Sequence, residues 1–252
     1  MAEKRVPGPL HGLWVAAGFL TRVPVGDVSR GDSTQVDMAR AVPWFPSIGL
    51  AIGALQGGVY FGTSQLVSPL VAAILSVGAS LLVTGAFHHD GLADIADAFG
   101  GGWTVEERMI ILKDSRLGTY GVSALAVALI LEVAAISQLS PIDSLRALVI
   151  SHSLGRATAL GAMLLSPTAG NGMGASYMDR LSTPAVSLGI AVAVVASFFV
   201  DPTAWLLALT AAAIAGAFVV ALAIRKIGGV NGDVLGAVTV VAGLAVLVIA
   251  GV

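Results

Sequence analysis

The chain has 252 residues, of which 56% are hydrophobic and 11% are charged, and its formal net charge is −2. A soluble domain carries about 25% charged residues, so this composition and a mean hydropathy of +0.91 exclude an ordinary water-soluble enzyme and a disordered chain. The small net charge offers no basic surface for nucleic acid, and the lack of cysteine excludes disulfides and thiolate metal sites. We therefore expect an integral membrane protein.

Long apolar runs without charge clusters predict membrane-spanning helices. A helix needs about 20 apolar residues to cross the hydrocarbon core, so the first run, Gly12–Thr21, is too short and is expected to form an interfacial or re-entrant helix. Seven later runs are long enough: Ala41–Gly62, Val67–Phe87, Gly118–Leu139, Leu145–Leu165, Pro184–Val200, Thr203–Ile224 and Val234–Val252. The predicted fold class is all-α, a polytopic transmembrane bundle of about seven spans in a single domain, residues 1–252.

The connections between these runs alternate between short and long. Eleven of the 13 Lys and Arg residues lie in the long connections, which fall on one side of the membrane if there are seven spans. The positive-inside rule places that side in the cytoplasm, so we expect a multi-pass membrane protein whose long, charged connections face the cytoplasm. In the first span, Gly49, Gly53 and Gly57 recur every four residues, a spacing that lets a neighbouring helix pack closely.

The densest polar segment begins at His88 and contains three aspartates. On a helix, Asp90, Asp94 and Asp97 fall within an arc of about 60°. Like charges this close repel each other unless a cation binds them, and oxygen ligands favour Mg²⁺ together with substrate phosphates. Residues 88–117 are therefore predicted to form a cytoplasmic metal-binding helix and loop. The alternatives are a solvated acidic face and a zinc site made by His88 and His89 with Asp90.

Basic residues near these aspartates suggest phosphate chemistry. Lys113 and Arg116 precede the third span, where they either neutralise a bound diphosphate or simply flank the membrane. Arg156 lies inside the fourth span, so it either pairs with Glu132 or a carbonyl, or faces a polar cavity toward phosphate. Asp233 sits in a glycine-rich turn before the last span. These residues predict a membrane enzyme that uses Mg²⁺ on a phosphorylated substrate.

Five motifs in order make the chain resemble the cobalamin synthase, or adenosylcobinamide-GDP ribazoletransferase, family. They are Thr21-Arg22-Val23-Pro24, Phe45-Pro46-Ser47-Ile48-Gly49, His88 with Asp90-Gly91-Leu92-Ala93-Asp94 and Asp97, Lys113-Asp114-Ser115-Arg116-Leu117-Gly118, and Gly232-Asp233-Val234-Leu235-Gly236-Ala237. Two positions depart from the family pattern: His89 replaces a commonly apolar residue, and Asn231 replaces the usual Thr.

The resemblance implies a membrane phosphotransferase of late vitamin B12 synthesis. It would transfer the adenosylcobinamide-phosphoryl group from adenosylcobinamide-GDP to α-ribazole or its 5′-phosphate, release GMP and require Mg²⁺. Asp90 and Asp94 would hold the metal, and Asp97 or Asp233 would be a further ligand or the base. The other implied roles are charge stabilisation by Lys113, Arg116 and Arg156, and substrate binding by Arg22, His88, Asp114, Arg156 and Asn231. The partners would be these small molecules and the lipid bilayer, without nucleic acid, and an oligomer is left open.

Two other functions compete with this one. A CDP-alcohol phosphotransferase of lipid synthesis also uses aspartates and Mg²⁺, but its motif has an aspartate where His88 stands. A membrane transporter could use Glu132, His152 and Arg156 as a relay in the middle of the membrane. That function leaves the clustered aspartates unexplained.

Overall fold

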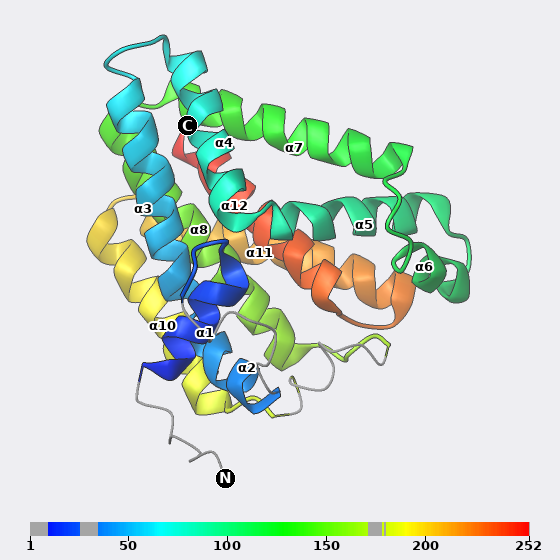
Figure 1. Ribbon diagram of the computed structural model, residues 1–252. Helices are drawn as coiled ribbons and strands as arrows, with labels where there is room; N and C mark the ends of the chain where they lie inside the picture. Colours follow the sequence, from blue (N-terminus) through cyan, green and yellow to red (C-terminus); the bar gives the residue numbers. More distant parts are fainter. Residues whose placement is uncertain (1–9, 26–34, 171–177, 179, 252) are drawn as a thin grey trace.

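The computed structural model describes residues 10–25, 35–170, 178 and 180–251, and its helices are shown in Figure 1. Within these ranges the chain is helical, and an isolated bridge between Thr168 and Val230 is its one β-type pairing. The elements are α1 (His11–Leu20), α2 (Gln35–Ala41), the 3₁₀ turn η2 (Val42–Trp44), α3 (Phe45–Thr63), α4 (Pro69–Thr84), α5 (Phe87–Gly101), α6 (Val105–Ile111), α7 (Thr119–Gln138), α8 (Pro141–Leu165), α10 (Thr183–Val200), α11 (Trp205–Ile227) and α12 (Gly232–Ala250). The predicted all-α class is confirmed.

Six of the predicted spans are helices long and apolar enough to cross a membrane: the run Asp37–Thr63, α7, α8, α10, α11 and α12. Large apolar side chains are exposed on the outer helices, among them Val127, Ile130, Leu188, Phe199, Ile214 and Phe218. Such a surface would be unfavourable in water but suits the hydrocarbon of a bilayer. The protein is a multi-pass helical membrane protein, and α1, with ten residues, is too short to span.

The second predicted span, Val67–Phe87, takes a different form. Helix α4 has only 16 residues, and it forms with α5 a pair bent by 91° that counts as a seventh span only if both parts are taken together. The bend lies at Gly85 and Ala86, which have φ values of 63° and 57°. This left-handed conformation ends the hydrogen bonding of α4 and turns the chain into α5. The acidic segment is therefore the second half of a broken helix pair and packs between α7 and α12 (Figure 1).

Helix α8 forms the centre of the bundle. It packs against α3, α10, α11 and α12, and 67% of its most apolar window is buried. The glycines of α3 face it: a Cβ atom on Gly49, Gly53 or Gly57 would collide with the main chain of α8 around His152, Leu148 or Leu145. The predicted close helix approach at this glycine repeat is confirmed.

Gly53→Ala is expected to lower the free energy of unfolding by about 1–3 kcal/mol, because the new methyl group would force α3 away from the α8 backbone. The matched control is Gly58→Ala on the same helix, where no other atom lies within 4 Å of the new Cβ. Thermal unfolding of both variants in detergent measures the difference. Equal melting temperatures for the two would contradict the packing described for Gly53.

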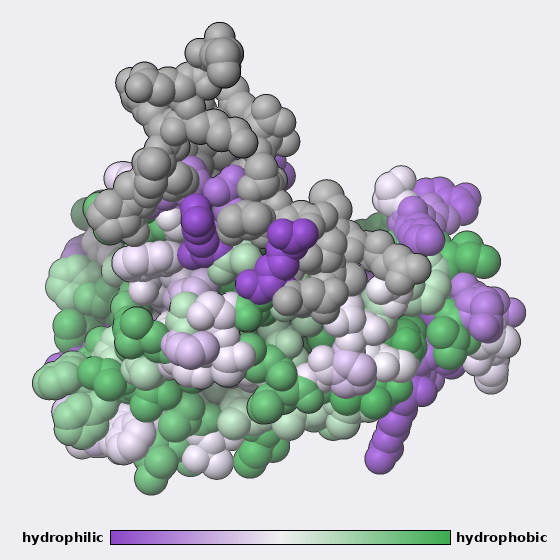
Figure 2. All heavy atoms as spheres, turned by 90° about the horizontal axis from the view of Figure 1, so that it is seen from below, coloured by the Kyte–Doolittle hydropathy of each residue, from purple (hydrophilic) through white to green (hydrophobic). Residues whose placement is uncertain are grey.

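Polar surface gathers at one edge of the molecule. Seen from below in Figure 2, apolar residues cover much of the described surface, and hydrophilic side chains lie at the edge where α5 ends and α6 is placed. The exposed charged residues of this region are Glu106, Glu107, Lys113 and Arg116. Helix α6 begins with a capping box in which Thr104 and Glu107 satisfy each other's backbone N–H groups. The end of α5 therefore lies at the polar edge of the molecule.

Candidate functional site

The acidic residues are brought together by a close crossing of α5 and α12. Gly91 of α5 lies so near α12 that a Cβ atom there would be 2.8 Å from the carbonyl oxygen of Asp233, and Gly236 faces the backbone of His88 and Gly91. Only residues without side chains permit this approach. The crossing places Asp233, in the first turn of α12, beside the part of α5 that carries Asp90 and Asp94.

The aspartates of this crossing are close enough to repel each other. Asp90 is exposed, whereas Asp94, Asp97 and Asp233 are half-buried, and the other three act on Asp94 as like charges. Within the described ranges no Lys or Arg forms an ion pair with any of them. Half-buried carboxylates without a basic partner are costly unless a cation or a proton compensates them. The first turn of α12 offers partial compensation at Asp233 through the helix dipole.

Asp97 connects α5 to α7. Its carboxylate oxygens accept hydrogen bonds from the backbone N–H of Gly118 at 2.7 Å and of Gly121 at 2.8 Å. A Cβ atom on either glycine would collide with this carboxylate, so the two glycines make room for it. Asp97 therefore satisfies free N–H groups at the start of α7, a structural role in addition to the predicted metal-binding or catalytic one.

Asp97→Asn is expected to lower the free energy of unfolding by about 1–3 kcal/mol, because an amide can accept only one of the two bonds and leaves a buried N–H unsatisfied. Thermal unfolding without substrate measures this loss. Asp94→Asn is the matched control, since the Asp94 side chain makes no hydrogen bond within the described chain. Unchanged melting of Asp97→Asn would contradict the structural role.

Asn231 is the N-cap of α12. Its side-chain oxygen accepts the Val234 N–H at 3.0 Å, and its amide nitrogen donates to Asp233 Oδ2 at 3.3 Å. The first bond satisfies one of the free N–H groups of the helix. Predicted as a substrate-binding residue, Asn231 is thus also positioned to hold the Asp233 carboxylate in place.

Two of the predicted cationic residues, Lys113 and Arg116, lie in the loop between α6 and α7. Arg116 donates a bidentate pair of hydrogen bonds to Asp114, and its side chain is otherwise 87% exposed. The guanidinium holds the pKa of the Asp114 carboxyl at about 2 through these hydrogen bonds. Lys113 is exposed. The loop reaches the site at Gly118, but the Arg116 side chain contacts Asp114 rather than the aspartates of α5.

Arg22 is placed beside the bend that precedes α5. Its backbone N–H donates to Val83 O at 2.6 Å, and a Cβ atom on Gly85 would meet its guanidinium. Arg22 therefore attaches the segment after α1 to the end of α4. It is exposed and lies beside the turn that leads into His88, although that turn is far from it in the sequence.

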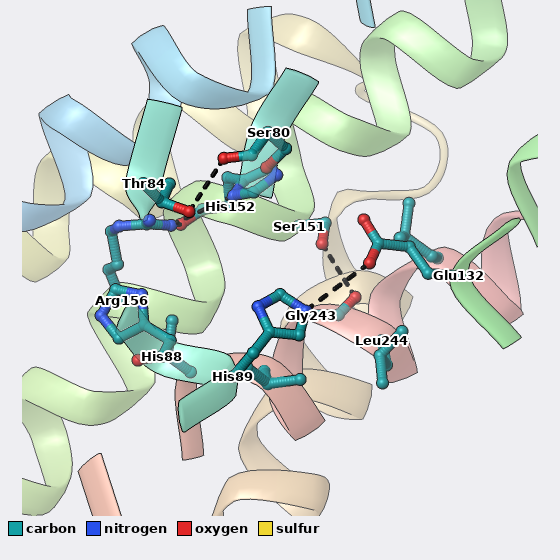
Figure 3. A pocket seen from close by; sticks show the side chains of 13 residues that line it. Ser80, Thr84, His88, His89, Glu132, Ser151, His152, Arg156, Gly243 and Leu244 are labelled. Carbon is teal, nitrogen blue, oxygen red and sulfur yellow. Dashed lines mark hydrogen bonds and ion pairs between the residues drawn. The ribbon is translucent and has the colours of Figure 1, made fainter. Parts of the chain in front are cut away.

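His88 lies next to the buried Arg156, as Figure 3 shows. Both residues line two small cavities of about 50 Å³ each. Arg156 is only 2% exposed and donates from Nη1 to the His152 carbonyl at 2.9 Å. The sequence predicted that Arg156 either pairs with Glu132 or a carbonyl, or faces a polar cavity. In the structure Arg156 donates to a carbonyl and also lines cavities with polar residues, but it does not pair directly with Glu132.

The metal-binding capacity of the site depends on its substrate. Among the described residues, no three His, Asp or Glu side chains converge closely enough to hold a metal ion by themselves. His89 faces Glu132 at 3.9 Å, so the zinc arrangement with Asp90 gains no support. Mg²⁺ typically uses one or two carboxylates and completes its shell with substrate phosphates and water. The unpaired carboxylates at the α5–α12 crossing fit that mode of binding.

One buried residue of this region was not predicted from the sequence. Gln56 of α3 is fully buried and hydrogen-bonds to both Glu132 and His152. The signal was present, since an amide in the middle of an apolar span needs a partner in a low-dielectric environment. Its partners lie 76 and 96 residues away in the sequence, so they could not be assigned without the structure.

Fold and site together define a multi-pass helical membrane protein with a carboxylate-rich polar site at the crossing of two helices. A family model for cobalamin-5-phosphate synthase matches residues 12–251, and the chain belongs to this family. It is an enzyme, a transferase. No solved structure matches it.

Curated relatives named adenosylcobinamide-GDP ribazoletransferase match nearly the whole chain. The protein from Ralstonia pickettii (strain 12J) is 38% identical over 237 residues, covering 90% of this chain and 89% of its own length. The protein from Shewanella pealeana is 35% identical over 234 residues, covering 90% of each chain. That from Bradyrhizobium diazoefficiens is 38% identical over 244 residues, covering 94% of this chain and 92% of its own.

Proposed function

We propose that the protein catalyses the Mg²⁺-dependent transfer of the adenosylcobinamide-phosphoryl group from adenosylcobinamide-GDP to α-ribazole or α-ribazole 5′-phosphate. GMP is released, and the product is adenosylcobalamin or its 5′-phosphate. The relatives from Ralstonia pickettii and Shewanella pealeana are named for a reaction with these substrates, which supports the proposal. The structural observation that carries the proposal is the group of unpaired carboxylates where α5 crosses α12.

The reaction is an in-line displacement at phosphorus. A bond forms between a ribose hydroxyl oxygen of the ribazole, one that stays free when the 5′-oxygen carries phosphate, and the cobinamide-linked phosphorus, while the bond from that phosphorus to the oxygen of GMP breaks. The hydroxyl proton goes to a carboxylate base, and GMP leaves with the bridging oxygen. The bonds that form and break all belong to the substrates. The protein therefore contributes positioning, charge stabilisation and a base.

The aspartates divide this work. Asp90 and Asp94 would hold the metal, which when bound neutralises the diphosphate and so favours attack by a hydroxyl group. Asp233 is the better placed of the two candidates for the base or further ligand, because Asp97 is already bonded to two backbone N–H groups. Asp233 lies in the first turn of α12 at the crossing, and its carboxylate accepts a hydrogen bond from Asn231.

Basic residues would stabilise the charge that moves onto GMP. Lys113 is free of a carboxylate partner among the described residues, whereas Arg116 would have to exchange Asp114 for the substrate. Arg22 and His88 approach from the α4–α5 bend, and Arg156 lies behind His88. Since Lys113 and Arg116 belong to the long, charged connections, we place this site at the cytoplasmic face of the bacterial inner membrane.

The experiment is a transfer assay with the purified full chain in liposomes. GMP should appear only when adenosylcobinamide-GDP, an acceptor and Mg²⁺ are all present, and EDTA should stop its release. CDP-diacylglycerol with an alcohol acceptor serves as the comparison. Release of CMP in that mixture, or no corrinoid product with either ribazole acceptor, would overturn the proposal.

A further inference from the structure

A chain of hydrogen bonds links three helices behind the site. Gln56 of α3 donates to Glu132 Oε1 of α7 at 2.8 Å, and its side-chain oxygen lies 2.6 Å from Nε2 of His152 on α8. One helical turn further, Arg156 Nη1 lies 3.2 Å from His152 Nδ1. The Gln56, Glu132 and Arg156 side chains are all buried. The chain therefore runs from a carboxylate to a guanidinium through two neutral groups, and His152 is its only partly buried member within the described residues.

The direction of every bond in this chain is determined by its two ends. Arginine only donates, so His152 must accept at Nδ1 and carry its proton on Nε2. That proton is donated to the Gln56 oxygen, which orients the Gln56 amide nitrogen toward the Glu132 carboxylate. The chain has one self-consistent arrangement, so a substitution at Glu132 or Gln56 would change the orientation of the Arg156 guanidinium.

Arg156 is held on one side and free on the other. Nη1 is occupied by the His152 carbonyl and ring, whereas Nε is buried without any partner and Nη2 has none among the described residues. Nε and Nη2 form the edge of the guanidinium that binds two oxygens of a carboxylate or phosphate at once. An unpaired N–H in a buried position is costly, so this edge points to a ligand.

Two small cavities lie beside Arg156. Each of the two cavities lined by Arg156 and His88 has about 50 Å³, whereas about 10–15 Å³ suffices for one water by this kind of measure. One cavity extends to Gly232 and Gly236 in the first turns of α12, next to Asp233. This cavity therefore connects Arg156 with the first turn of α12, which carries Asp233.

We propose that Glu132, Gln56 and His152 are positioning residues, which hold Arg156 so that its Nε and Nη2 bind two oxygens of a substrate phosphoryl group. This inference rests on the proposed function, which supplies the phosphorylated substrate. It extends that function by three residues that contact neither the substrate nor the metal. They act through the orientation of one guanidinium.

Binding of inorganic pyrophosphate to the purified protein tests the oxyanion site without turnover. Isothermal titration should show binding that is weakened at least tenfold in Arg156→Lys, Gln56→Met and His152→Asn. Gln65→Leu is the matched control, because Gln65 is an exposed amide just beyond the C-terminal end of α3. This variant should bind pyrophosphate like the unchanged protein. Unaltered binding in Gln56→Met and His152→Asn, with melting temperatures unchanged, would overturn the positioning role.

Transfer kinetics then distinguish positioning from general structural support. If His152 and Gln56 act through Arg156, His152→Asn and Gln56→Met should each raise KM for adenosylcobinamide-GDP at least tenfold. Neither substitution should raise KM further when it is combined with Arg156→Lys. Glu132→Asp should restore part of what Glu132→Gln loses. Additive losses in the double variants would overturn the inference. Absence of transfer in the unchanged protein would instead refute the proposed function. The pyrophosphate titration would still test whether Arg156 binds oxyanions and whether the other three residues position it.

Discussion

Asp94→Asn is expected to lower the rate of phosphoryl transfer by about 10³-fold or more, and Asp90→Asn by a similar factor. Each change removes one of the carboxylates proposed to hold Mg²⁺, and the loss of a single electrostatic contact to a reacting centre already costs about 10²–10³-fold in other enzymes. The assay is release of GMP from adenosylcobinamide-GDP at saturating Mg²⁺. Glu106→Gln, an exposed carboxylate in the first turn of α6, is the control and should retain full activity.

Stability should move independently of activity in these variants. The Asp94 side chain makes no hydrogen bond or ion pair among the described residues and is surrounded by like charges. Removing its charge is therefore expected to leave the melting temperature equal or higher in the absence of metal. Membrane insertion should be normal. Activity within a few-fold of the unchanged protein would remove Asp94 from the proposed metal site.

Gly91→Ala should reduce transfer by about 10²-fold through geometry alone. A Cβ atom at this position would lie 2.8 Å from the Asp233 carbonyl oxygen and 3.1 Å from its Cα, so α12 must shift relative to α5. A misplacement of about 1 Å at a reacting centre can cost 10²-fold. The measurement is kcat with saturating substrates, corrected for the folded fraction.

The matched control for this change is Gly101→Ala at the other end of α5. There the new Cβ would make only an ordinary contact, 3.6 Å from Ile111 Cδ1, so activity should be unchanged. If Gly91→Ala and Gly101→Ala behaved alike, the close crossing of α5 and α12 would not be what brings Asp233 to the other aspartates.

Most of the membrane-spanning helices could be predicted from the sequence, because charged residues, proline or glycine mark the two ends of each apolar run. The α8 span was predicted to begin at Leu145, but the helix starts at Pro141, since Ser140 caps it and Asp143 stabilises its first turn. The bend at Gly85 and Ala86 was not predicted. Nothing in an apolar run indicates that a non-glycine residue such as Ala86 will adopt a left-handed conformation.

The candidate site was predicted in composition but not in arrangement. Helical periodicity was enough to place Asp90 and Asp94 on one face of α5. It could not indicate that Asp97 is bonded to Gly118 and Gly121, because those partners belong to the next long helix. The sequence grouped Glu132, His152 and Arg156, but it could not indicate that the link from Glu132 to His152 passes through Gln56 on α3.

The most direct test of the proposed reaction follows one phosphorus atom. Adenosylcobinamide-GDP labelled at the cobinamide-linked phosphorus is incubated with the protein in liposomes, α-ribazole 5′-phosphate and Mg²⁺, and the products are separated. In-line attack at that phosphorus predicts that all transferred label is found in adenosylcobalamin 5′-phosphate, with unlabelled GMP in equal amount. Label recovered in free cobinamide phosphate, or no labelled product at all, would contradict it.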